Sequence, residues 1–470
     1  MAIYDRLSAQ DRSFLELESP NHHMHVAGCF IFERGALSTP TGGVDIDKLR
    51  NYVASRLHRI PRYRQRIAWI PVENHPVWVD DDRFNIHYHV RHTALPAPGD
   101  ERQLKRFCGR VMSQQLDRGK PLWEMWVVEG LEHDRFALVC KTHHCMVDGV
   151  SGVDLLAVLL SPTLDKEFEP AARWLPNPTP SGVVLLRDAV LRRAELPFAM
   201  AGAVAAALRA PEATLARVSE SVAAFGETLS TAMSPATDTP LNRPIGPHRR
   251  FDWVGFDIDE VKKVKNALGG TVNDVVLATV SGAVGRFLEQ RGISISRQRG
   301  MDFRAFCPVS VRSDDERGAM GNRVSGMIAK LPIAETQPKR RLERVRAITK
   351  NLKESKQALG AQVLTSVSEW TAPTLATMAS RLAFENRTAN MIVTNVPGPQ
   401  IPLYLLGARM AETYPMVPLF SSQGLGVALF SYAGGLYWGF VCDWDQFPDL
   451  HDFVCAIDAS FRELCDAADA

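Results

Sequence analysis

The chain has 470 residues, of which 46% are hydrophobic and 23% charged, with 54 lysines and arginines against 53 aspartates and glutamates. This composition excludes a disordered tail, a collagen-like fibre and a small disulfide-stapled scaffold. A single hydrophobic core usually stops growing at about 250 to 300 residues, so the length favours two domains. The net charge of +1 lacks the strongly basic character of nucleic-acid-binding domains, and we expect no nucleic-acid partner.

The eight cysteines contain no C-x-x-C pair, and the N-terminus lacks the apolar core of a signal peptide. Both features predict a reducing, cytoplasmic environment. No run of about 18 uncharged apolar residues is present, so no membrane-spanning helix is expected. Peripheral contact with a membrane stays open.

The first 30 residues combine an acidic and aromatic patch, Asp11 to Glu18, with a histidine-rich stretch, His22 to His25. A strand is predicted at Ala27–Phe32. The histidines lack the i, i+4 or C-x-x-C spacing that brings ligands onto one ion, so a structural or surface role is favoured and no metal site is expected. A helix then follows from Val44, and the arginine-rich stretch after it, Arg56 to Arg66, either meets anionic groups or complements the helix dipole.

A helix at Glu101–Leu116 and strands at Trp123–Gly130 and Phe136–Thr142 lead into the sequence His143-His144-Cys145-Met146-Val147-Asp148-Gly149. A helix resumes at Gly152. This motif therefore lies at a strand-to-helix turn, where side chains can project into a cleft.

Histidine can act as a general base near neutral pH. Adjacent strand residues point to opposite faces, so only one of His143 and His144 faces a given cleft and the other is structural. Asp148 either orients the imidazole or forms an ion pair that shapes the turn, and Gly149 permits close backbone approach. Cys145 is a poor candidate nucleophile because catalytic thiol–imidazole pairs are assembled by the fold.

The chain contains no G-x-S-x-G elbow, no Walker A loop and no G-x-G-x-x-G after a strand. Acyl-serine hydrolases, P-loop enzymes and dinucleotide-binding enzymes therefore have no local support.

Residues 181–250 are expected to form a crossover linker whose helix, Val183–Ala210, is apolar and flanked by arginines. It either docks on lipid head groups or packs across the domain surface. Strands and helices alternate again after Arg250. We therefore predict an α/β protein with mixed sheets and two halves, residues 1–180 and 251–470, joined by the linker. The elements expected in the second half are strands Phe251–Ile258 and Met301–Val311 with helices Asp259–Ala267, Val272–Gln290, Lys339–Leu359 and Val363–Phe384.

The His143-His144-x-x-x-Asp148-Gly149 motif resembles the signature of coenzyme A-dependent acyltransferases of the chloramphenicol acetyltransferase and condensation-domain type. Further blocks, in order along nearly the whole chain, resemble the bacterial wax ester synthase/diacylglycerol acyltransferase family. These blocks are Leu7-Ser8 through Leu15, Met24-His25-Val26, Leu116 to Trp123, Val272-Asn273-Asp274, Pro308 to Arg312, Gly321-Asn322 and Asn395 to Pro399.

The resemblance implies two chloramphenicol acetyltransferase-like halves that face each other across a central tunnel, with the histidine motif at its middle. It implies that His144 is the general base, which takes the proton of an alcohol hydroxyl as the oxygen attacks the thioester of a fatty acyl-CoA. Transfer is direct, without an acyl-enzyme. The resemblance gives no cofactor, since acyl-CoA is a substrate.

The resemblance also implies that Asp148 is structural and pairs with an arginine, for which Arg312 is the candidate. His143 packs behind the site. Asn273 either donates to the developing oxyanion or, with Asp274, caps the helix that follows them. A set of three residues, Pro121, Leu122 and Trp123, is expected to shape the acyl tunnel.

The implied substrates are a long-chain acyl-CoA and a diacylglycerol or fatty alcohol. Because the lipid substrates are insoluble, we expect peripheral contact with the inner face of the plasma membrane or with lipid droplets, through the helix between Val183 and Arg209. An acyltransferase for another lipid or polyketide hydroxyl and an inactive lipid-binding protein are the alternatives. The cationic residues considered for holding CoA phosphates are Arg249, Arg250, Lys262, Lys263 and Lys265, although a solvated helix face explains the lysines as well.

Overall fold

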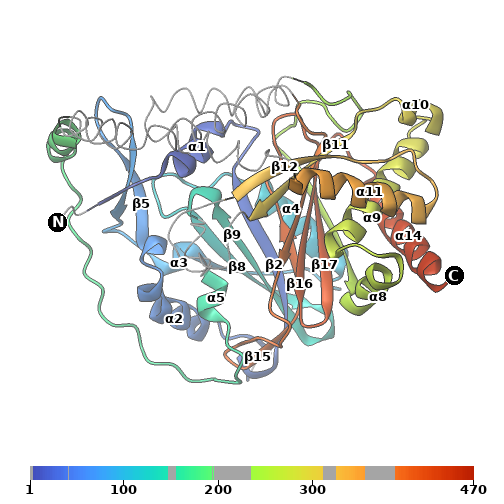
Figure 1. Cartoon of the computed structure of the whole chain (residues 1–470). Helices are drawn as coiled ribbons and strands as arrows, with labels where there is room; N and C mark the ends of the chain where they lie inside the picture. Colours follow the sequence, from blue (N-terminus) through green and yellow to red (C-terminus); the bar gives the residue numbers. More distant parts are fainter. Residues whose placement is uncertain are drawn as a thin grey trace, which may run out of the picture.

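The computed structural model describes residues 4–40, 42–146, 155–192, 194, 234–310, 324–354 and 387–470. Two six-stranded sheets with helices packed against them make up most of this part of the chain (Figure 1). Each sheet contains both parallel and antiparallel strand pairs. The predicted α/β class with mixed sheets is therefore confirmed, whereas the central tunnel and the division of the chain at residues 181 and 251 stay predictions.

The first sheet has the strand order β14-β15-β2-β9-β8-β7. Its strands are β2 (His25–Glu33), β7 (Val90–Ala94), β8 (Trp123–Leu131), β9 (Arg135–His143), β14 (Tyr404–Leu405) and β15 (Ala408–Met416). The helices of this half are α1 (Ala9–Leu17), α2 (Ile46–Arg56), α3 (Ile86–His89), α4 (Glu101–Ser113) and α5 (Leu155–Leu159). A smaller sheet joins β1 (Asp5–Arg6), β6 (Pro76–Asp80) and β5 (Gln65–Trp69), and a further pair joins β3 (Ser38–Thr39) and β4 (Gly43–Val44).

The second sheet has the order β10-β17-β16-β13-β11-β12. Its strands are β10 (Arg249–Asp257), β11 (Arg304–Ser310), β12 (Val324–Lys330), β13 (Met391–Pro397), β16 (Leu425–Tyr432) and β17 (Gly435–Asp443). The accompanying helices are α8 (Ile258–Leu268), α9 (Val272–Gln290), α10 (Ile295–Arg299), α11 (Pro338–Glu354) and α14 (Leu450–Asp469). Helix α11 starts one residue before the expected helix, whose last residues, 355–359, lie outside the described part, as does the helix expected at Val363–Phe384.

Two strands from late in the chain complete the first sheet. Strand β15 pairs antiparallel with β2, with Tyr414 opposite Cys29. The hairpin β14–β15 therefore joins a sheet whose other strands all precede residue 144. A small apolar cluster also joins the two regions, because Met24 packs with Ile392, Phe420 and Ala428. The two sheets are therefore connected both by backbone pairing and by side-chain packing.

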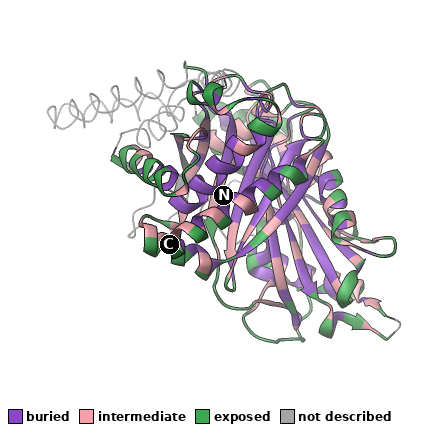
Figure 2. Ribbon diagram, turned by 90° about the vertical axis from the view of Figure 1, so that its right-hand side faces the viewer, coloured by how far each residue is buried: buried purple, intermediate pink, exposed green. Residues whose placement is uncertain are grey.

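Helix α9 forms the centre of the second core. Nearly all its residues from Asp274 to Leu288 are buried, and it packs against α8, α11 and α14 (Figure 1). Figure 2 shows that the sheet strands are also largely buried, whereas the exposed residues lie mostly on helices and in loops. No individual helix in the described ranges has the length and apolar character needed to cross a bilayer. The one pair that meets this test in combination, α8 with α9, is bent by 95° at its break.

Candidate active site

His144 lies at the point where β9 ends. The strand stops at His143, and residues His144–Met146 form one turn of 3-10 helix. The backbone N–H of His144 donates to the carbonyl of Met24 at 2.7 Å, and its ring packs on Phe14 of α1 with centroids 4.2 Å apart. His144 is therefore held through its ring by the N-terminal helix α1 and through its backbone by Met24, the residue just before β2.

Burial and, to a smaller extent, the neighbouring His143 lower the pKa of His144 to about 4, and the residue's own backbone partly opposes this shift. Its Nδ1 makes no hydrogen bond of normal geometry to any described residue. At neutral pH the ring is therefore uncharged and has a nitrogen lone pair available, which is the state that a general base requires.

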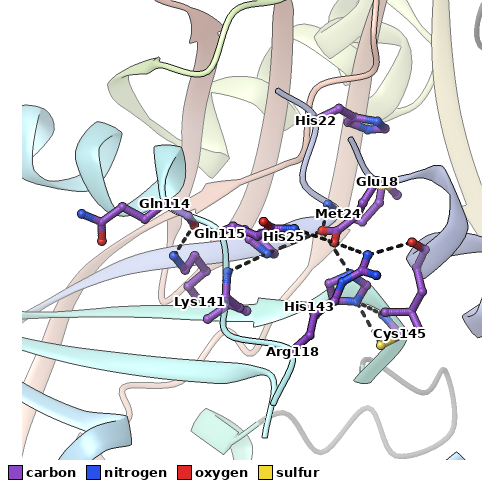
Figure 3. A network of polar contacts seen from close by, with 12 residues as sticks. Glu18, His22, Met24, His25, Gln114, Gln115, Arg118, Lys141, His143 and Cys145 are labelled. Atoms are coloured by element: carbon purple, nitrogen blue, oxygen red, sulfur yellow. Dashed lines mark hydrogen bonds and ion pairs between the residues drawn. The ribbon is translucent and has the colours of Figure 1, made fainter. Parts of the chain in front are cut away.

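His143 lies in a buried polar cluster with Glu18, His25 and Cys145 (Figure 3). Its Nδ1 accepts from the backbone N–H of Cys145 at 3.1 Å, and its Nε2 lies 3.2 Å from Oε1 of Glu18. An amide N–H is always a donor, so Nδ1 is the acceptor, and a proton on Nε2 is directed toward the carboxylate. His143 is 1% exposed, which fits the expected structural role of one of the two histidines.

Glu18 is the centre of this cluster, and its side chain is only 2% exposed. Oε2 accepts from Arg118 at 2.6 Å and from Gln115 at 3.4 Å, while Oε1 accepts from the backbone N–H of Met24 at 2.8 Å. Nε2 of His25 lies 3.7 Å from Oε1. Figure 3 shows these groups converging on the one carboxylate.

Burial alone would raise the pKa of Glu18. The contact with His143, together with His25 and Arg118, outweighs burial and holds the pKa of Glu18 well below its usual range. Burial moves His25 the other way, because it lowers the pKa of that imidazole well below its ordinary value. At neutral pH the cluster therefore contains an ionised Glu18 balanced by the Arg118 guanidinium.

The Pro121-Leu122-Trp123 block lies beside the histidine motif. The backbone N–H of His143 donates to the carbonyl of Leu122 at 2.9 Å, and Trp123 is paired with Thr142 across β8 and β9. Trp123 is 1% exposed, and its indole N–H donates to the carbonyl of Tyr63 at 2.8 Å. The block thus supports the end of β9, and its expected role in shaping a tunnel stays a prediction.

A cavity of about 410 Å³ lies next to this block. Pro121 and Trp123 are among its lining residues, and so are Gln115 and Arg118, which hold Glu18. The remaining lining residues are Tyr88, Arg91, Gln114, Leu116, Asp117 and Glu124. Gln115 and Arg118 therefore both line this cavity and hold the carboxylate of Glu18.

Asp274 has a role in the start of α9. The helix begins at Val272, and Thr271 is its N-cap: the Thr271 hydroxyl accepts from Asp274 N–H at 3.2 Å, and the Asp274 carboxylate accepts from Thr271 N–H at 2.7 Å. Thr349 also donates to Asp274, at 2.6 Å. One alternative was that Asn273 and Asp274 cap the helix. Asp274 does take part in the capping, but the cap residue itself is Thr271. No described hydrogen bond links this pair to His144, and the oxyanion role of Asn273 stays a prediction.

Three predicted site residues, Asp148, Gly149 and Arg312, lie outside the described part of the chain. The thiol of Cys145 is buried, and burial raises its pKa well above the ordinary value. A protonated thiol is a weak nucleophile, in agreement with the low rank given to Cys145. Among the described residues, no group of three or more histidine, cysteine, aspartate or glutamate side chains is arranged to hold a metal ion.

The cationic residues considered for CoA phosphates already have protein partners. Arg249 is 6% exposed and donates to the carbonyls of Gly246, His248 and Asn21, so it ties β10 to the N-terminal segment. Arg250 stacks on Trp444 with its guanidinium 3.7 Å from the ring centroid. The lysines of α8 pair on its surface, Lys262 with Asp259, Lys263 with Asp469 and Lys265 with Asn266, as the solvated-face alternative proposes.

Sequence reasoning did not assign a role to Glu18, Arg118 or Gln115. The cluster depends on the pairing of β2 with β9, which sets His25 directly opposite His143, and on the segment after α4 reaching back to α1. No sequence signal distinguished Glu18, because the burial of its carboxylate, which requires pairing, is seen only in the structure. His22 and His25 are both buried, so of the two roles favoured for these histidines the structural one is right.

Comparison with known proteins gives two family matches. The wax ester synthase/diacylglycerol acyltransferase catalytic domain matches residues 7–276, and the WS/DGAT C-terminal domain matches residues 320–465. A Mycobacterium tuberculosis protein named "Probable diacyglycerol O-acyltransferase tgs1" is 31% identical over 475 residues, which cover 98% of this chain and 96% of that protein. Another M. tuberculosis protein with a diacyglycerol O-acyltransferase name is 33% identical over 477 residues, covering 100% and 91%.

Solved structures with a similar fold include a protein named for the same family. The wax ester synthase/diacylglycerol acyltransferase from Marinobacter aquaeolei VT8 matches with a TM-score of 0.68 and 25% identity, covering 99% of this chain and 100% of that chain. The starter condensation domain of rhizomide synthetase RzmA matches with a TM-score of 0.58 at 13% identity, covering 100% and 95%. At that identity the second likeness concerns the fold alone.

Proposed function

Because the chain belongs to the wax ester synthase/diacylglycerol acyltransferase family, we propose that it transfers a long-chain fatty acyl group from acyl-CoA to the hydroxyl of diacylglycerol, and also to long-chain alcohols. His144 is the general base in this proposal. The observation that supports it best is the uncharged imidazole of His144, fixed at the end of β9 with its pKa lowered to about 4.

The proposed step is a direct transfer. The imidazole takes the hydroxyl proton while the oxygen attacks the thioester carbonyl, the carbon–sulfur bond then breaks, and the CoA thiolate leaves and recovers the proton from the imidazolium. The products are an ester and free CoA thiol. Holding both substrates beside one base makes the reaction effectively unimolecular. Asp148 keeps its implied structural role at the turn, with Arg312 as its candidate partner.

The experiment measures release of CoA thiol from palmitoyl-CoA with diacylglycerol and with hexadecanol, for the wild type and for His144→Ala. We expect turnover with diacylglycerol and a loss of about 100- to 10,000-fold in the variant, the usual contribution of a general base. Absence of turnover with either acceptor would reject the proposed activity. Full activity of His144→Ala would reject the assigned base.

We further propose that the helix at residues 182–192 contacts the lipid surface from which insoluble substrates are collected. Leu185 and Ala189 are buried against the β5–β6 sheet, whereas Val183 is 78% and Val190 58% exposed. Leu186, Leu191, Trp69 and Val72 are also exposed large apolar side chains. Arg187 adds a largely exposed guanidinium on the same helix. An apolar stripe beside cationic groups is typical of interfacial helices. The rest of the predicted helix, residues 193 and 195–210, lies outside the described part.

Flotation with vesicles of phosphatidylcholine and phosphatidylglycerol tests this surface. The double variant Val183→Glu/Val190→Glu should bind vesicles less than the wild type while keeping turnover of detergent-dispersed substrate. Leu164→Glu is the control, since Leu164 is 62% exposed but precedes the helix. Equal loss of flotation in the control, or none in the double variant, would contradict this surface.

A further inference from the structure

One oxygen of Glu18, Oε1, is connected through Met24 and His143 to the backbone on both sides of His144. On one side, Oε1 accepts from the backbone N–H of Met24 at 2.8 Å, and the carbonyl of Met24 accepts from the N–H of His144 at 2.7 Å. On the other side, Oε1 lies 3.2 Å from Nε2 of His143, whose Nδ1 accepts from the N–H of Cys145 at 3.1 Å. The same atom therefore restrains the peptide groups before and after the proposed base.

The second oxygen of Glu18 fixes the carboxylate itself. Arg118 and Gln115 both donate to Oε2, so the side chain cannot rotate without breaking bonds at both ends. Arg118 also donates to the carbonyl of Leu15 at 2.8 Å, which ties the guanidinium to α1, the helix that carries Phe14. The ring of Phe14 packs on His144. The imidazole is therefore held by α1, and α1 is tied through Arg118 to the same carboxylate, Glu18, that holds the end of β9.

We propose that Glu18 is a positioning residue for acyl transfer: its carboxylate holds the backbone on both sides of His144 and so sets where the base nitrogen meets the substrate hydroxyl. This inference rests on the proposed function, because it takes His144 as the base. In this proposal Glu18 acts through His143 and Met24 and not by contact with the substrate or the reacting atoms. A displacement of about 1 Å in a reacting group can cost about 100-fold in rate, so loosening these two peptides is enough to be measured.

The test compares Glu18→Met, which has a similar length and no acceptor, with Glu18→Gln, which keeps one carbonyl oxygen for Met24 and His143. Glu33→Gln is the matched control, since Glu33 ends the same strand that begins at His25, and its side chain is 54% exposed. We expect Glu18→Met to lower kcat by about 10- to 100-fold with little change in KM for palmitoyl-CoA. Glu18→Gln should recover most of this loss, and Glu33→Gln should match the wild type.

A second comparison separates positioning from simple stabilisation of the fold. In the His144→Ala background, Glu18→Met should cause little further loss of the residual rate, because both changes act on the same group. A purely structural role predicts the same fold-loss in both backgrounds. Thermal unfolding of each variant shows that it is folded at the assay temperature. If Glu18→Met does not fold, Glu18→Gln decides: its kcat should lie within a few-fold of the wild type and below it.

The outcomes separate the two proposals. No wild-type turnover overturns the proposed function and the role of Glu18 with it. Wild-type turnover together with an unchanged kcat in Glu18→Met overturns the role of Glu18 alone. An equal loss in the His144→Ala background, or a Glu18→Gln variant as impaired as Glu18→Met, also overturns it.

Discussion

Lys141 offers a direct test of how the segment beside the active site is held. Its side chain is 1% exposed, and its ammonium group donates to the carbonyls of Val111 and Gln114, both at 2.8 Å. It also forms an ion pair of 2.6 Å with Glu124, whose side chain is 5% exposed. Lys141 therefore joins β9 to β8 and to the end of α4, from which the chain continues to Gln115 and Arg118.

Replacing Lys141 by Met keeps the aliphatic volume and removes the charge. Glu124 would keep Arg91 as a partner at 3.1 Å but lose the closer cation, and the carbonyl of Gln114 would lose a donor. Breaking a buried ion pair by removing one partner costs about 3 to 5 kcal/mol. We expect a decrease of this size in the free energy of unfolding, and a lower kcat because the segment holding Glu18 is loosened.

Urea unfolding followed by tryptophan fluorescence measures the change. Lys262→Met is the control, since Lys262 is half exposed and pairs with Asp259 on the surface of α8, where such pairs contribute about 0 to 1 kcal/mol. The double variant Lys141→Met/Glu124→Gln should be more stable than Lys141→Met by about 1 kcal/mol or more, because it no longer buries a poorly compensated carboxylate. A single variant as stable as the wild type, or a double variant less stable than the single one, would refute this reasoning.

Three further predictions concern the pH dependence of activity, the pH dependence of stability, and the packing of α4 on β10. The acidic limb of the kcat/KM profile should lie near pH 4, below the ordinary histidine value of 6.5, because the pKa of His144 is lowered to about 4; a limb near pH 6.5 would contradict this. Burial lowers the pKa of His22 and of His89 to about 4 as well, so the unfolded chain binds more protons between pH 6.5 and 4, and the melting temperature should fall as the pH drops through this window. Gly109→Ala should destabilise by about 1 to 3 kcal/mol in urea unfolding, because its Cβ would lie 2.8 Å from the carbonyl oxygen of Arg249; unchanged stability would show that α4 can move away from β10.

The elements around the motif were predictable because their patterns are local. Alternation of apolar residues places a strand before His143, and β9 ends there. The start of α9 at Val272 was also predicted. Capping by Asn273 and Asp274 was one of two alternatives, and the cap is Thr271. Both Thr271 and Asp274 are residues found at helix starts, and only geometry shows which one is the cap.

The relations between distant segments were not predictable in this way. Nothing in the apolar pattern of Ala408–Met416 shows that β15 pairs with β2 rather than with the strands that follow it in sequence. In the same way, Glu18 and Arg118 are 100 positions apart, and each alone resembles an ordinary surface charge. Their pairing follows from the β2–β9 register and from the return of the chain after α4, both of which are decided by the packing of the whole half.

Burial of His144 both lowers the pKa of its imidazole and fixes the position of the ring. A general base is most effective when its pKa lies near the working pH, and burial has lowered the pKa of His144 to about 4. Its intrinsic basicity at neutral pH is therefore lower than that of an exposed histidine. In return, the imidazole is uncharged in essentially every molecule, and it is fixed by Phe14, Met24 and the Glu18 cluster. In the proposed mechanism, catalysis by such a base depends more on placement than on basicity, because orientation can supply about 7 to 11 kcal/mol of the barrier. For that reason we expect changes that loosen His144 without altering its chemistry, such as Glu18→Met, to lower kcat strongly.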